Sequence, residues 1–515
     1  MTGTTLDTIL RRLARDRGTK VALRCDDEVL TYAELDARAC RVANGLAAAG
    51  LRPGDRVAWV GKNCAAFFEF LAGAIKFGAV MVPVNWRLAA PEVAYVLGDS
   101  QAKFVIAEPE FAAAAVPAGG VAPILCGGPG DGYALWRDAQ PGHDAGHTAD
   151  WGDGLLQMYT SGTTGRPKGA VLSHRSILGL RAAMTAATMP PWHEWAETDV
   201  SLIAMPVAHV SGTGWAIWSL QHGATGVITR EFDPHAVFEL MVEHRINKII
   251  MVPTAMQIAV RHPRARSTDF SFVKYICYGA APMPLALLRE CIEVFGCGFV
   301  QMYGMTETAG AIVALPPDDH DTENSARLAS VGRPLPGVEL RILDPSGQPL
   351  PAGEIGEIAT RSLANMTGYH NLPKATAETI DGEGWLHTGD AGYLDADGYL
   401  FLKDRIKDLI ISGGENVYPA EVENAIYGHP DVAEVAVIGV PDAKWGESVK
   451  AIVVAKPGTN PEAAGIIAWT RARIAAYKTP KYVEFVAALP RNASGKILRR
   501  ELRERFSQPT RTSRA

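Results

Sequence analysis

Short apolar runs rich in β-branched residues alternate with longer amphipathic segments through the first 335 residues or so. Such runs occupy residues 56–63, 103–109, 248–254, 273–282 and 298–307. Each run ends at glycine, proline or polar residues, a pattern that is typical of buried strands. The most apolar stretch, residues 64–86, is interrupted by Glu69 and Lys76, so we expect a buried helix running into a strand rather than a membrane span.

One helix between two of these runs indicates how the strands pair. Apolar residues recur at positions 288, 291, 292 and 295, with a proline near the start of the segment and a glycine at its end. A strand, a helix and a strand at this spacing form a βαβ unit, which favours parallel pairing. Ligands of parallel sheets bind beyond the carboxyl ends of the strands, where the segments YGAAPM (278–283) and YGMTET (303–308) fall.

The pattern changes after about residue 335. Apolar and polar residues alternate around Asp-Gly and Gly-Glu turns, which predicts antiparallel hairpins with one solvated face. From Pro419 the order helix, strand, strand, helix, strand, helix predicts a compact α+β domain. The charged run 403–408 marks the expected joint, and residues 507–515 are expected to form a disordered tail.

Composition narrows the class of protein. The chain has 515 residues, 47% of them hydrophobic, which is enough for more than one domain. A net charge of −6 gives no general attraction to nucleic acid or anionic lipid, so neither is expected as a partner. Seven scattered cysteines without a C-x-x-C pair indicate buried reduced thiols. The polar N-terminus shows no secretory signal, and we expect a cytoplasmic protein.

The stretch YTSGTTGRPKGAVLSH, residues 159–174, has the composition of a phosphate site. Consecutive backbone N–H groups in a Gly/Ser/Thr loop can bind an anion, and Lys168 adds a positive charge. The common phosphate loop requires Gly-Lys-Ser/Thr, whereas Gly169 follows the lysine here. An ordinary surface loop is the alternative, because Ser, Thr and Gly are common loop residues.

Together with that stretch, several motifs in order along the chain make the sequence resemble the adenylate-forming superfamily, which includes acyl-CoA synthetases, luciferases and peptide-synthetase adenylation domains. These are YGMTET (303–308), GEIGEI (353–358), GWLHTGD (384–390), KDRIKDLIISGGENVYPAEVE (403–423) and PRNASGKILRREL (490–502). The resemblance implies an α/β fold with a large N-terminal domain of stacked βαβ sheets, an antiparallel β subdomain, and a small mobile α+β C-terminal domain.

The resemblance also implies a reaction. A carboxylic acid attacks the α-phosphate of MgATP, releasing pyrophosphate, and a thiol such as that of CoA then takes the acyl group from AMP. Glu307 is the expected Mg²⁺ ligand, with the Thr306 hydroxyl nearby, although the pair could instead cap a helix. The residues implied in nucleotide binding are Thr160, Ser161, Gly162, Thr163, Thr164, Gly165, Lys168, Gly279, Ala280, Ala281, Tyr303, Gly304, Asp390 and Arg405.

Two of these assignments have alternatives in the residues themselves. The small Gly279 and its neighbours leave room for a flat adenine, and Tyr303 offers a ring to stack on it. Tyr303 taken alone would be better interpreted as a core aromatic, but the adjoining YGMTET motif favours the stacking role. Asp390 resembles the family's ribose ligand, although Gly-Asp pairs are also common in turns. Arg405 corresponds to an arginine that reaches the nucleotide.

The resemblance further implies that the small domain moves. Lys496 would bridge the carboxylate and the α-phosphate during adenylation, an electrostatic contribution to the transition state. Lys407 matches the hinge position, and Gly413 and Gly414 would let the pantetheine arm pass close to the backbone. The expected domains are residues 1–404 for acid and ATP binding, 405–407 as hinge and 408–506 as the mobile domain.

Residues 205–220 are the region expected to select the carboxylic acid substrate. Amino-acid-activating relatives carry an aspartate here, whereas this chain has His209, so an α-amino acid is not expected. His209 could orient the carboxylate or be structural, and Gly212, Gly214 and Trp215 indicate an apolar cavity that Met302 would help to line. A medium or long fatty acid is favoured, and an arylpropenoic or benzoic acid is the alternative.

Other functions remain to be weighed. A kinase or motor ATPase would need Gly-Lys-Ser/Thr and would leave the C-terminal motifs without a role. A nucleotide sensor would be expected to lack Lys496 or Glu307, and both are present. Luciferase-type oxygenation, a carrier-protein pantetheine as acceptor, and assembly as a homodimer stay open.

Overall fold

The computed structural model describes residues 4–116, 122–128, 130–160, 166–185, 190–281, 283–323, 326–491 and 497–507. The chain forms two compact units. The first contains Met1–Leu340 and Thr360–Leu386, and the second contains Arg341–Ala359 and His387–Ala515. The predicted boundary at residues 404–408 concerns the joint about which a domain would turn, so compact packing does not test it and it stays a prediction. The predicted tail lies almost entirely outside the described residues.

A nine-stranded sheet forms one layer of the first unit. Its strands are β1 (Val21–Cys25), β2 (Glu28–Thr31), β9 (Val200–Ile203), β10 (Thr225–Ile228), β11 (Lys248–Met251), β12 (Tyr275–Gly279), β13 (Gly298–Met305), β14 (Gly310–Leu315) and β15 (Arg333–Pro334). They lie in the order β15-β14-β13-β12-β11-β9-β10-β1-β2. The strands from β13 to β1 pair in parallel, whereas β14, β15 and β2 add antiparallel edges.

A seven-stranded sheet forms another layer of the same unit. Its strands are β3 (Arg56–Val60), β4 (Val80–Val84), β5 (Phe104–Ala107), β6 (Ile124–Leu125), β7 (Gly154–Thr160), β8 (Lys168–Ser173) and β18 (Gly368–Tyr369). Their order is β18-β8-β7-β4-β3-β5-β6. The strands from β7 to β6 are parallel, and β8 and β18 extend one edge in antiparallel fashion.

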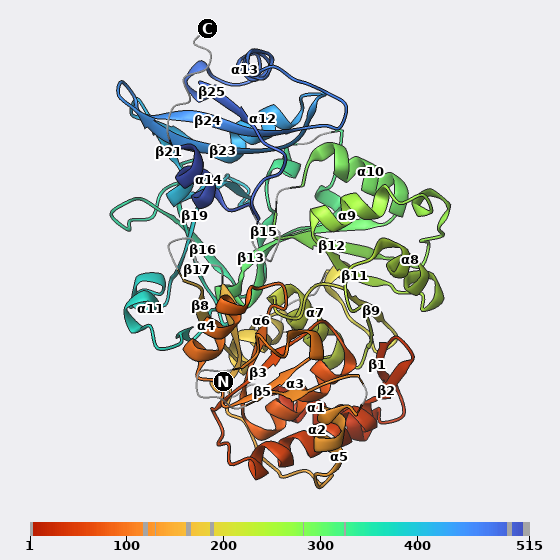
Figure 1. Ribbon diagram of the computed structural model, residues 1–515. Helices are drawn as coiled ribbons and strands as arrows, with labels where there is room; N and C mark the ends of the chain where they lie inside the picture. Colours follow the sequence, from red (N-terminus) through yellow and green to blue (C-terminus); the bar gives the residue numbers. More distant parts are fainter. Residues whose placement is uncertain are drawn as a thin grey trace. The chain divides into compact units, whose positions relative to one another are not determined.

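Helices cover both sheets. They are α1 (Leu6–Asp16), α2 (Tyr32–Ala48), α3 (Ala65–Phe77), α4 (Ala90–Ser100), α5 (Gly132–Asp138), α6 (His174–Thr185), α7 (Val210–Gln221), α8 (Pro234–Glu243), α9 (Pro253–Val260), α10 (Leu285–Phe295) and α11 (Pro373–Thr379). Figure 1 shows α8, α9 and α10 together beside β11 and β12, with which they share a hydrophobic core. The predicted βαβ unit is confirmed as β12–α10–β13, with its two strands parallel.

The alternation along β3 shows why the seven-stranded sheet is buried on both faces. Val57 and Trp59 pack into the core that contains α2 and α3, whereas Ala58 and Val60 pack into the core on the α4 side. Successive side chains of a strand point to opposite faces, so a strand covered on both sides is apolar throughout. Residues 64–86 form α3 followed by β4, which confirms the predicted buried helix and strand.

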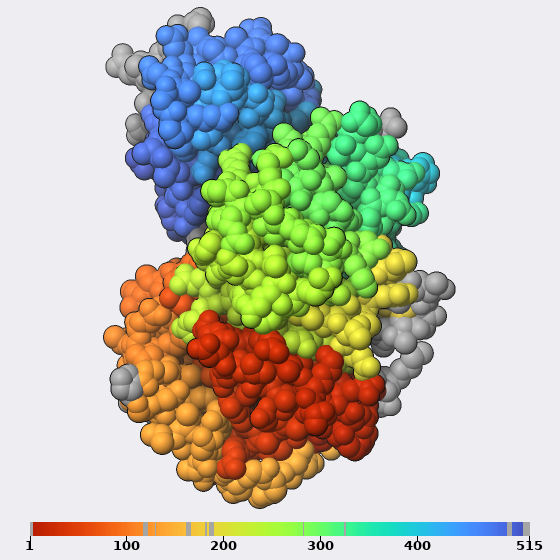
Figure 2. Space-filling view, turned by 90° about the vertical axis from the view of Figure 1, so that its right-hand side faces the viewer, coloured from red at the N-terminus to blue at the C-terminus, as the bar shows by residue number. Residues whose placement is uncertain are grey.

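The N-terminal residues connect the two sheets. Strands β1 and β2 extend the nine-stranded sheet, while α1 and α2 pack against α3. In Figure 2 these red segments lie between the orange segments and the yellow-green ones. None of the helices within the described ranges is long and apolar enough to cross a membrane.

A four-stranded sheet lies mostly in the second unit. Its strands are β16 (Glu339–Leu343), β17 (Gly356–Arg361), β19 (Leu386–Leu394) and β20 (Leu400–Arg405), in that order. Strands β19 and β20 form an antiparallel pair, as the alternating pattern predicts.

The remaining strands and helices of the second unit form the predicted α+β arrangement. They are β21 (Ile410–Ser412), β22 (Glu415–Val417), α12 (Pro419–Tyr427), β23 (Val432–Asp442), β24 (Gly446–Ala455), α13 (Ala463–Arg471), β25 (Tyr482–Phe485) and α14 (Arg499–Phe506). Along β23, Val435 and Val437 face the core beneath α12 and α13, whereas Ala436 and Ile438 face the core beneath α14. Each face of this sheet therefore has its own helical cover.

Two helices of this unit are shorter than the sequence pattern predicts. Helix α13 ends at Arg471, and the chain then turns so that Ile474 packs against the core. Helix α14 begins only at Arg499, because Ile497 is still extended and forms a β-bridge with Arg491.

All seven cysteines are free thiols, and all but Cys297 are buried. Burial raises the pKa of Cys25 to about 11, because the thiolate would lose its hydration. The predicted buried reduced thiols are confirmed.

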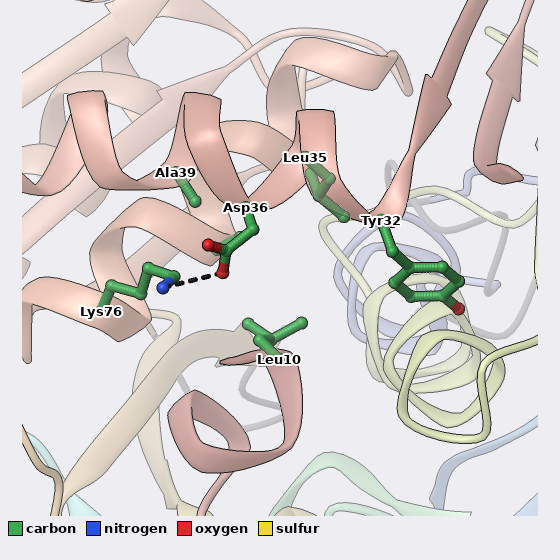
Figure 3. A pocket seen from close by; sticks show the side chains of 7 residues that line it. Leu10, Tyr32, Leu35, Asp36, Ala39 and Lys76 are labelled. Carbon is green, nitrogen blue, oxygen red and sulfur yellow. Dashed lines mark ion pairs between the residues drawn. The ribbon is translucent and has the colours of Figure 1, made fainter. Parts of the chain in front are cut away.

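Helix α3 carries two buried charges, and each is paired. Lys76 is 1% exposed, and its Nζ lies 2.8 Å from Asp36 Oδ1 of α2 and 2.8 Å from Asp144 Oδ2. Figure 3 shows the Lys76–Asp36 pair between α3 and α2, with Leu10 of α1 beside it. Glu69 is paired with Arg38 of α2 and Arg137 of α5. The two residues that break the apolar run thus join α3 to its neighbours.

We expect Lys76→Met to destabilise the protein by about 1–3 kcal/mol, because Asp36 loses its buried partner, whereas Asp144 keeps its ion pair with Arg11. Lys374→Met is the control, since Lys374 is 92% exposed and its ion pair with Glu378 spans 4.0 Å. Chemical denaturation of both variants measures the difference. Equal stability of the two variants would contradict a structural role for the buried pair.

Candidate active site

The predicted phosphate loop connects two antiparallel strands. Thr160 ends β7 and lies opposite Lys168, the first residue of β8. Tyr95 of α4 donates a hydrogen bond of 3.0 Å to Pro167 O and so fixes the C-terminal side of the loop. The loop residues Ser161, Gly162, Thr163, Thr164 and Gly165 lie outside the residues that the structure describes. The lysine is therefore held by a strand rather than by the first turn of a helix.

Lys168 and Glu307 contact the same tyrosine. The Nζ of Lys168 lies 4.8 Å from the centroid of the Tyr369 ring. The Tyr369 hydroxyl donates a hydrogen bond of 2.8 Å to Glu307 Oε1. Because β18 pairs with β8, with Tyr369 opposite Ala170, residues far apart in sequence meet at this edge of the sheet.

The turn after β13 holds Glu307. Residues Thr306–Thr308 form a 3₁₀ turn, and Thr308 Oγ1 accepts a hydrogen bond from Met305 N. The backbone of Met366 donates to Glu307 O at 2.8 Å. Thr308, and not Glu307, therefore caps the 3₁₀ turn. The Glu307 side chain, 5% exposed, is available for another role.

The surroundings of Glu307 suit a Mg²⁺ ion bound together with phosphates. One carboxylate oxygen accepts the Tyr369 hydroxyl, and Oε2 accepts no hydrogen bond from the residues that the structure describes. Within the same ranges no group of three or more His, Cys, Asp or Glu side chains could hold a metal ion. Mg²⁺ is commonly bound by one or two carboxylates plus substrate phosphates rather than by an all-protein cage, so this site fits it.

The segments after β12 and β13 lie side by side, and glycines allow their close approach. A Cβ atom at Gly279 would lie 2.1 Å from Met302 O. Ala280 has a φ of 65°, a conformation rare for residues with a side chain, and both Ala280 and Ala281 are exposed. Tyr303 lies in β13 and is half-buried. Ala280 and Ala281 therefore expose small side chains after β12, and their contact with adenine stays a prediction.

In the second unit, the two predicted nucleotide contacts pair with each other. Asp390 of β19 and Arg405 of β20 lie directly opposite, and Arg405 Nε is 2.7 Å from Asp390 Oδ1. Arg405 also donates to Thr388 O at 3.2 Å. A cross-strand ion pair of this kind fixes the direction of the carboxylate.

The predicted hinge residue has an unusual environment. Lys407 is exposed, but nearby protein atoms partly desolvate its ammonium group and lower its pKa to about 8, and the neighbouring Asp408 only partly offsets that effect. Asp408 is itself paired with Arg503 of α14 and lies 3.8 Å from Arg499. The chain after Arg405 is therefore tied to the last helix of the unit.

The glycines predicted to line the pantetheine path form a tight hairpin turn. Gly413 and Gly414 have φ angles of 63° and 86°, and Ser412 lies opposite Glu415 in the β21–β22 pair. Two successive positive φ angles are the signature of a type I′ turn, which glycine adopts without strain. The Gly413 N–H donates to Trp445 O at 2.8 Å.

His209 precedes α7 and lies beside Asn85, which follows β4. The distance between Asn85 Nδ2 and His209 Nε2 is 3.4 Å. The Asn85 Oδ1 accepts a hydrogen bond from Arg87 N at 3.0 Å, which orients the amide. If the amide donates to Nε2, the His209 proton is on Nδ1.

Gly212 and Trp215 both pack closely. A Cβ atom at Gly212 would lie 2.2 Å from Pro206 O, so a glycine is needed there for the start of α7. Trp215 is 6% exposed, and its ring meets that of Trp195 edge-on at 5.0 Å. Their part in an acid pocket, like that of Met302, stays a prediction.

Two residues near the predicted site were missed by sequence reasoning. Tyr369 becomes a neighbour of Lys168 only through the pairing of β18 with β8, which has no local sequence signal. Asn85 lies at the end of an apolar strand, where a polar residue beyond a parallel strand could have been singled out. Lys496 was predicted but lies outside the described residues.

Comparison with known proteins identifies the family of the chain. The family model described as AMP-binding enzyme matches residues 10–370, and the model of the AMP-binding enzyme C-terminal domain matches residues 421–496. The fatty acid–[acyl-carrier-protein] ligase ScoC of Streptomyces coeruleorubidus is 42% identical over 96% of this chain and 95% of its own length. A feruloyl-CoA synthase of an Amycolatopsis species is also 42% identical, over 96% of this chain and 98% of its own length.

A solved structure shares the fold over nearly the whole chain. The o-succinylbenzoate CoA synthetase (MenE) of Bacillus subtilis, in complex with the acyl-adenylate intermediate OSB-AMP, has a TM-score of 0.85 and 32% identity. The match covers 98% of both chains. The predicted α/β fold with a large N-terminal and a smaller C-terminal part is thereby confirmed.

We expect Gly304→Ala to destabilise the protein by about 1–3 kcal/mol or more, because its Cβ atom cannot fit against the neighbouring strand. The added atom would lie 1.9 Å from Gly310 O. Gly98→Ala is the matched control, since this glycine lies within α4 with no atom near its Cβ position, and it should stabilise by about 0.5–1 kcal/mol. Urea denaturation measures both signs, and a neutral Gly304→Ala would refute the close approach.

Proposed function

The chain belongs to the AMP-binding enzyme family and is an AMP-forming acid–thiol ligase, and from this premise we propose that it makes the CoA thioester of a medium or long fatty acid. One observation carries the proposal for the site: the lysine of the phosphate loop and the carboxylate of YGMTET meet on one tyrosine ring. Two groups suited to a metal-bound polyphosphate thus converge at one edge of a sheet.

The first half-reaction joins the acid to AMP. A carboxylate oxygen attacks the α-phosphorus of ATP, a new P–O bond forms, and the bond to pyrophosphate breaks. Lys168 would neutralise charge on the phosphates, and Lys496 would stabilise the charge that develops on the α-phosphate. Glu307 would hold Mg²⁺, which when bound neutralises phosphate oxygens and favours departure of pyrophosphate.

The rest of the nucleotide would lie against the segments already described. The exposed Ala280 and Ala281 provide a surface for adenine, with Tyr303 as the ring that stacks on it. The Asp390 carboxylate, oriented by Arg405, would accept the ribose hydroxyl protons. The ion pair supports this role because a fixed carboxylate loses little conformational freedom on binding.

The second half-reaction transfers the acyl group to CoA. The thiol attacks the acyl carbon, a C–S bond forms, and AMP departs with the oxygen that joined it to the acid. Lys496 is not needed for this step, so we propose that rotation at Lys407 replaces its loop by the Gly413-Gly414 turn. Gly413 and Gly414 contribute no side chains of their own to the tip of that hairpin, although the Trp445 ring packs against Gly413, so the proposed pantetheine arm would pass on the side of Gly414.

We propose a fatty acid as the substrate because residues 205–220, the region expected to select the acid, carry no charged side chains. Residues 205–220 contain no lysine, arginine or aspartate, so neither an amino acid nor a dicarboxylate has a counter-charge there. An arylpropenoic acid is the second candidate, supported by the feruloyl-CoA synthase at 42% identity. A carrier-protein pantetheine is the alternative acceptor, supported by the ligase ScoC.

The free thiols of the chain support a cytoplasmic location.

The experiment that tests this function is acid-dependent ATP–pyrophosphate exchange over fatty, aryl and amino acids, followed by addition of CoA or of a pantetheinylated carrier protein. We expect exchange with fatty acids of medium or long chain, a thioester with CoA, and no exchange with amino acids. Best exchange with ferulic acid would favour the second candidate. Exchange that needs no acid would contradict the proposed reaction.

Substitutions at Lys496 and at Lys407 should impair different half-reactions. Lys496→Ala should slow pyrophosphate release about 10²–10³-fold, because it removes one electrostatic donor from the transition state, and should spare thioester formation from supplied acyl-AMP. Lys407→Pro, which fixes φ near −65°, should still release pyrophosphate but accumulate acyl-AMP. Both half-reactions are measured separately on both variants. Loss of transfer in Lys496→Ala, or normal transfer in Lys407→Pro, would rule out the rotation.

A further inference from the structure

We propose that Tyr369 is a positioning residue that holds Lys168 and Glu307 in the arrangement MgATP requires, a role that rests on the proposed function. The tyrosine presents its ring to one residue and its hydroxyl to the other. It would contact neither the acid nor the nucleotide's reacting atoms. Its contribution is to fix the two charged groups before ATP arrives.

The ring limits where the lysine charge can be. Lysine carries a compact charge on a flexible four-carbon chain, which samples many positions when nothing contacts it. A tyrosine face within about 6 Å attracts an ammonium group through the ring quadrupole. At 4.8 Å from the ring centroid, the Lys168 ammonium is within that range.

The hydroxyl selects one oxygen of the carboxylate. It donates to Glu307 Oε1 at 2.8 Å, a charge-assisted bond that sets the plane of the carboxylate. The other oxygen, Oε2, has no hydrogen-bond donor among the described residues and remains available to a cation. Outer groups that orient a metal-binding carboxylate in this way strongly affect metal affinity.

The backbone of the tyrosine is held from two sides. It pairs with Ala170 across β18 and β8, two residues after the strand's first residue, Lys168. The Tyr369 N–H donates to Thr376 Oγ1 of α11 at 2.9 Å. A Cβ atom at the preceding Gly368 would lie 2.8 Å from Thr376 Cγ2, so glycine permits the close contact. These contacts fix the backbone from which the Tyr369 ring reaches Lys168 and Glu307.

Two variants distinguish the contribution of the Tyr369 ring from that of its hydroxyl group. Tyr369→Phe removes only the bond to Glu307, and Tyr369→Leu also removes the ring. We measure Mn²⁺ affinity by electron paramagnetic resonance with α,β-methylene ATP, together with the KM for ATP in pyrophosphate release. Tyr369→Phe should weaken Mn²⁺ binding about 10–100-fold, the usual effect of removing an orienting group. Its KM for ATP at saturating metal should change little.

Tyr369→Leu should show the same metal defect and also raise the KM for ATP by about two- to thirtyfold, the range for a lost cation–π contact. Lys168→Ala should raise that KM at least as much. In the double variant Lys168→Ala/Tyr369→Leu, the second substitution should add little to the KM.

Tyr133→Phe is the matched control. Tyr133 donates to the buried carboxylate of Glu69 at 3.4 Å, so the variant also removes a tyrosine–carboxylate hydrogen bond. It should lower thermal stability about as much as Tyr369→Phe and leave Mn²⁺ binding unchanged. Equal metal defects in the two variants would overturn the proposal, because a general loss of stability would then explain both.

Failure of this inference and failure of the proposed function give different results. Mn²⁺ affinity within twofold of the parent in a folded Tyr369→Phe protein overturns the positioning role and leaves acid-dependent exchange intact. A parent protein that binds Mn²⁺ and nucleotide but shows no acid-dependent exchange overturns the proposed function. In that case a metal defect in Tyr369→Phe still supports the positioning of Glu307.

Discussion

The layer of helices between the two large sheets depends on the pairing of the charges carried by α3. This helix is buried along its length, and an isolated charge inside such a layer would cost several kcal/mol, about as much as a domain's whole net stability. Glu69 and Lys76 avoid that cost by drawing partners from α2, from α5 and from the segment around Asp144. The pairs specify one alignment of these elements, whereas apolar contacts alone tolerate shifts. Through β3 and β4, which flank α3 in sequence, that alignment extends to the seven-stranded sheet.

The residues proposed to bind MgATP lie at the antiparallel edges of the sheets rather than among their parallel strands. Lys168 begins β8, Tyr369 ends β18, and Glu307 lies in the turn between β13 and β14. Parallel strands need long crossovers, whereas an antiparallel edge can accept a short strand from any part of the chain. Strand β18 has only two residues, yet it brings the tyrosine to the lysine from about two hundred positions away. The parallel strands support the edge, and the edge brings together the residues of the proposed site.

Much of the fold could be predicted from the sequence because its signals are local. The spacing of apolar residues in α10 and the alternation in β19 and β20 are visible within single windows and are confirmed. The contact between Lys168 and Tyr369 was not predictable, since it depends on a two-residue strand with no period of its own. Gly212 shows a second reason why the site was not fully predictable. The absence of a side chain suggests free space for a substrate, but the folded structure shows that the Pro206 carbonyl fills that space. The motifs themselves identified the family, while the acid depends on side-chain packing that motifs do not encode.

The surroundings of Lys407 link the arrangement of the chain to proton binding. Lys407 is exposed, but nearby protein atoms partly desolvate its ammonium group and lower its pKa to about 8, whereas a lysine in water titrates near 10.4. Any rearrangement that moves this side chain away from those atoms must therefore take up protons when the pH lies between those two values. Raising the pH through that window favours the arrangement described here, and lowering it favours one in which the ammonium group is fully hydrated. A turn at this residue would then be driven partly by the solution's acidity, so that the balance between two arrangements of the chain shifts without any change in nucleotide or acid.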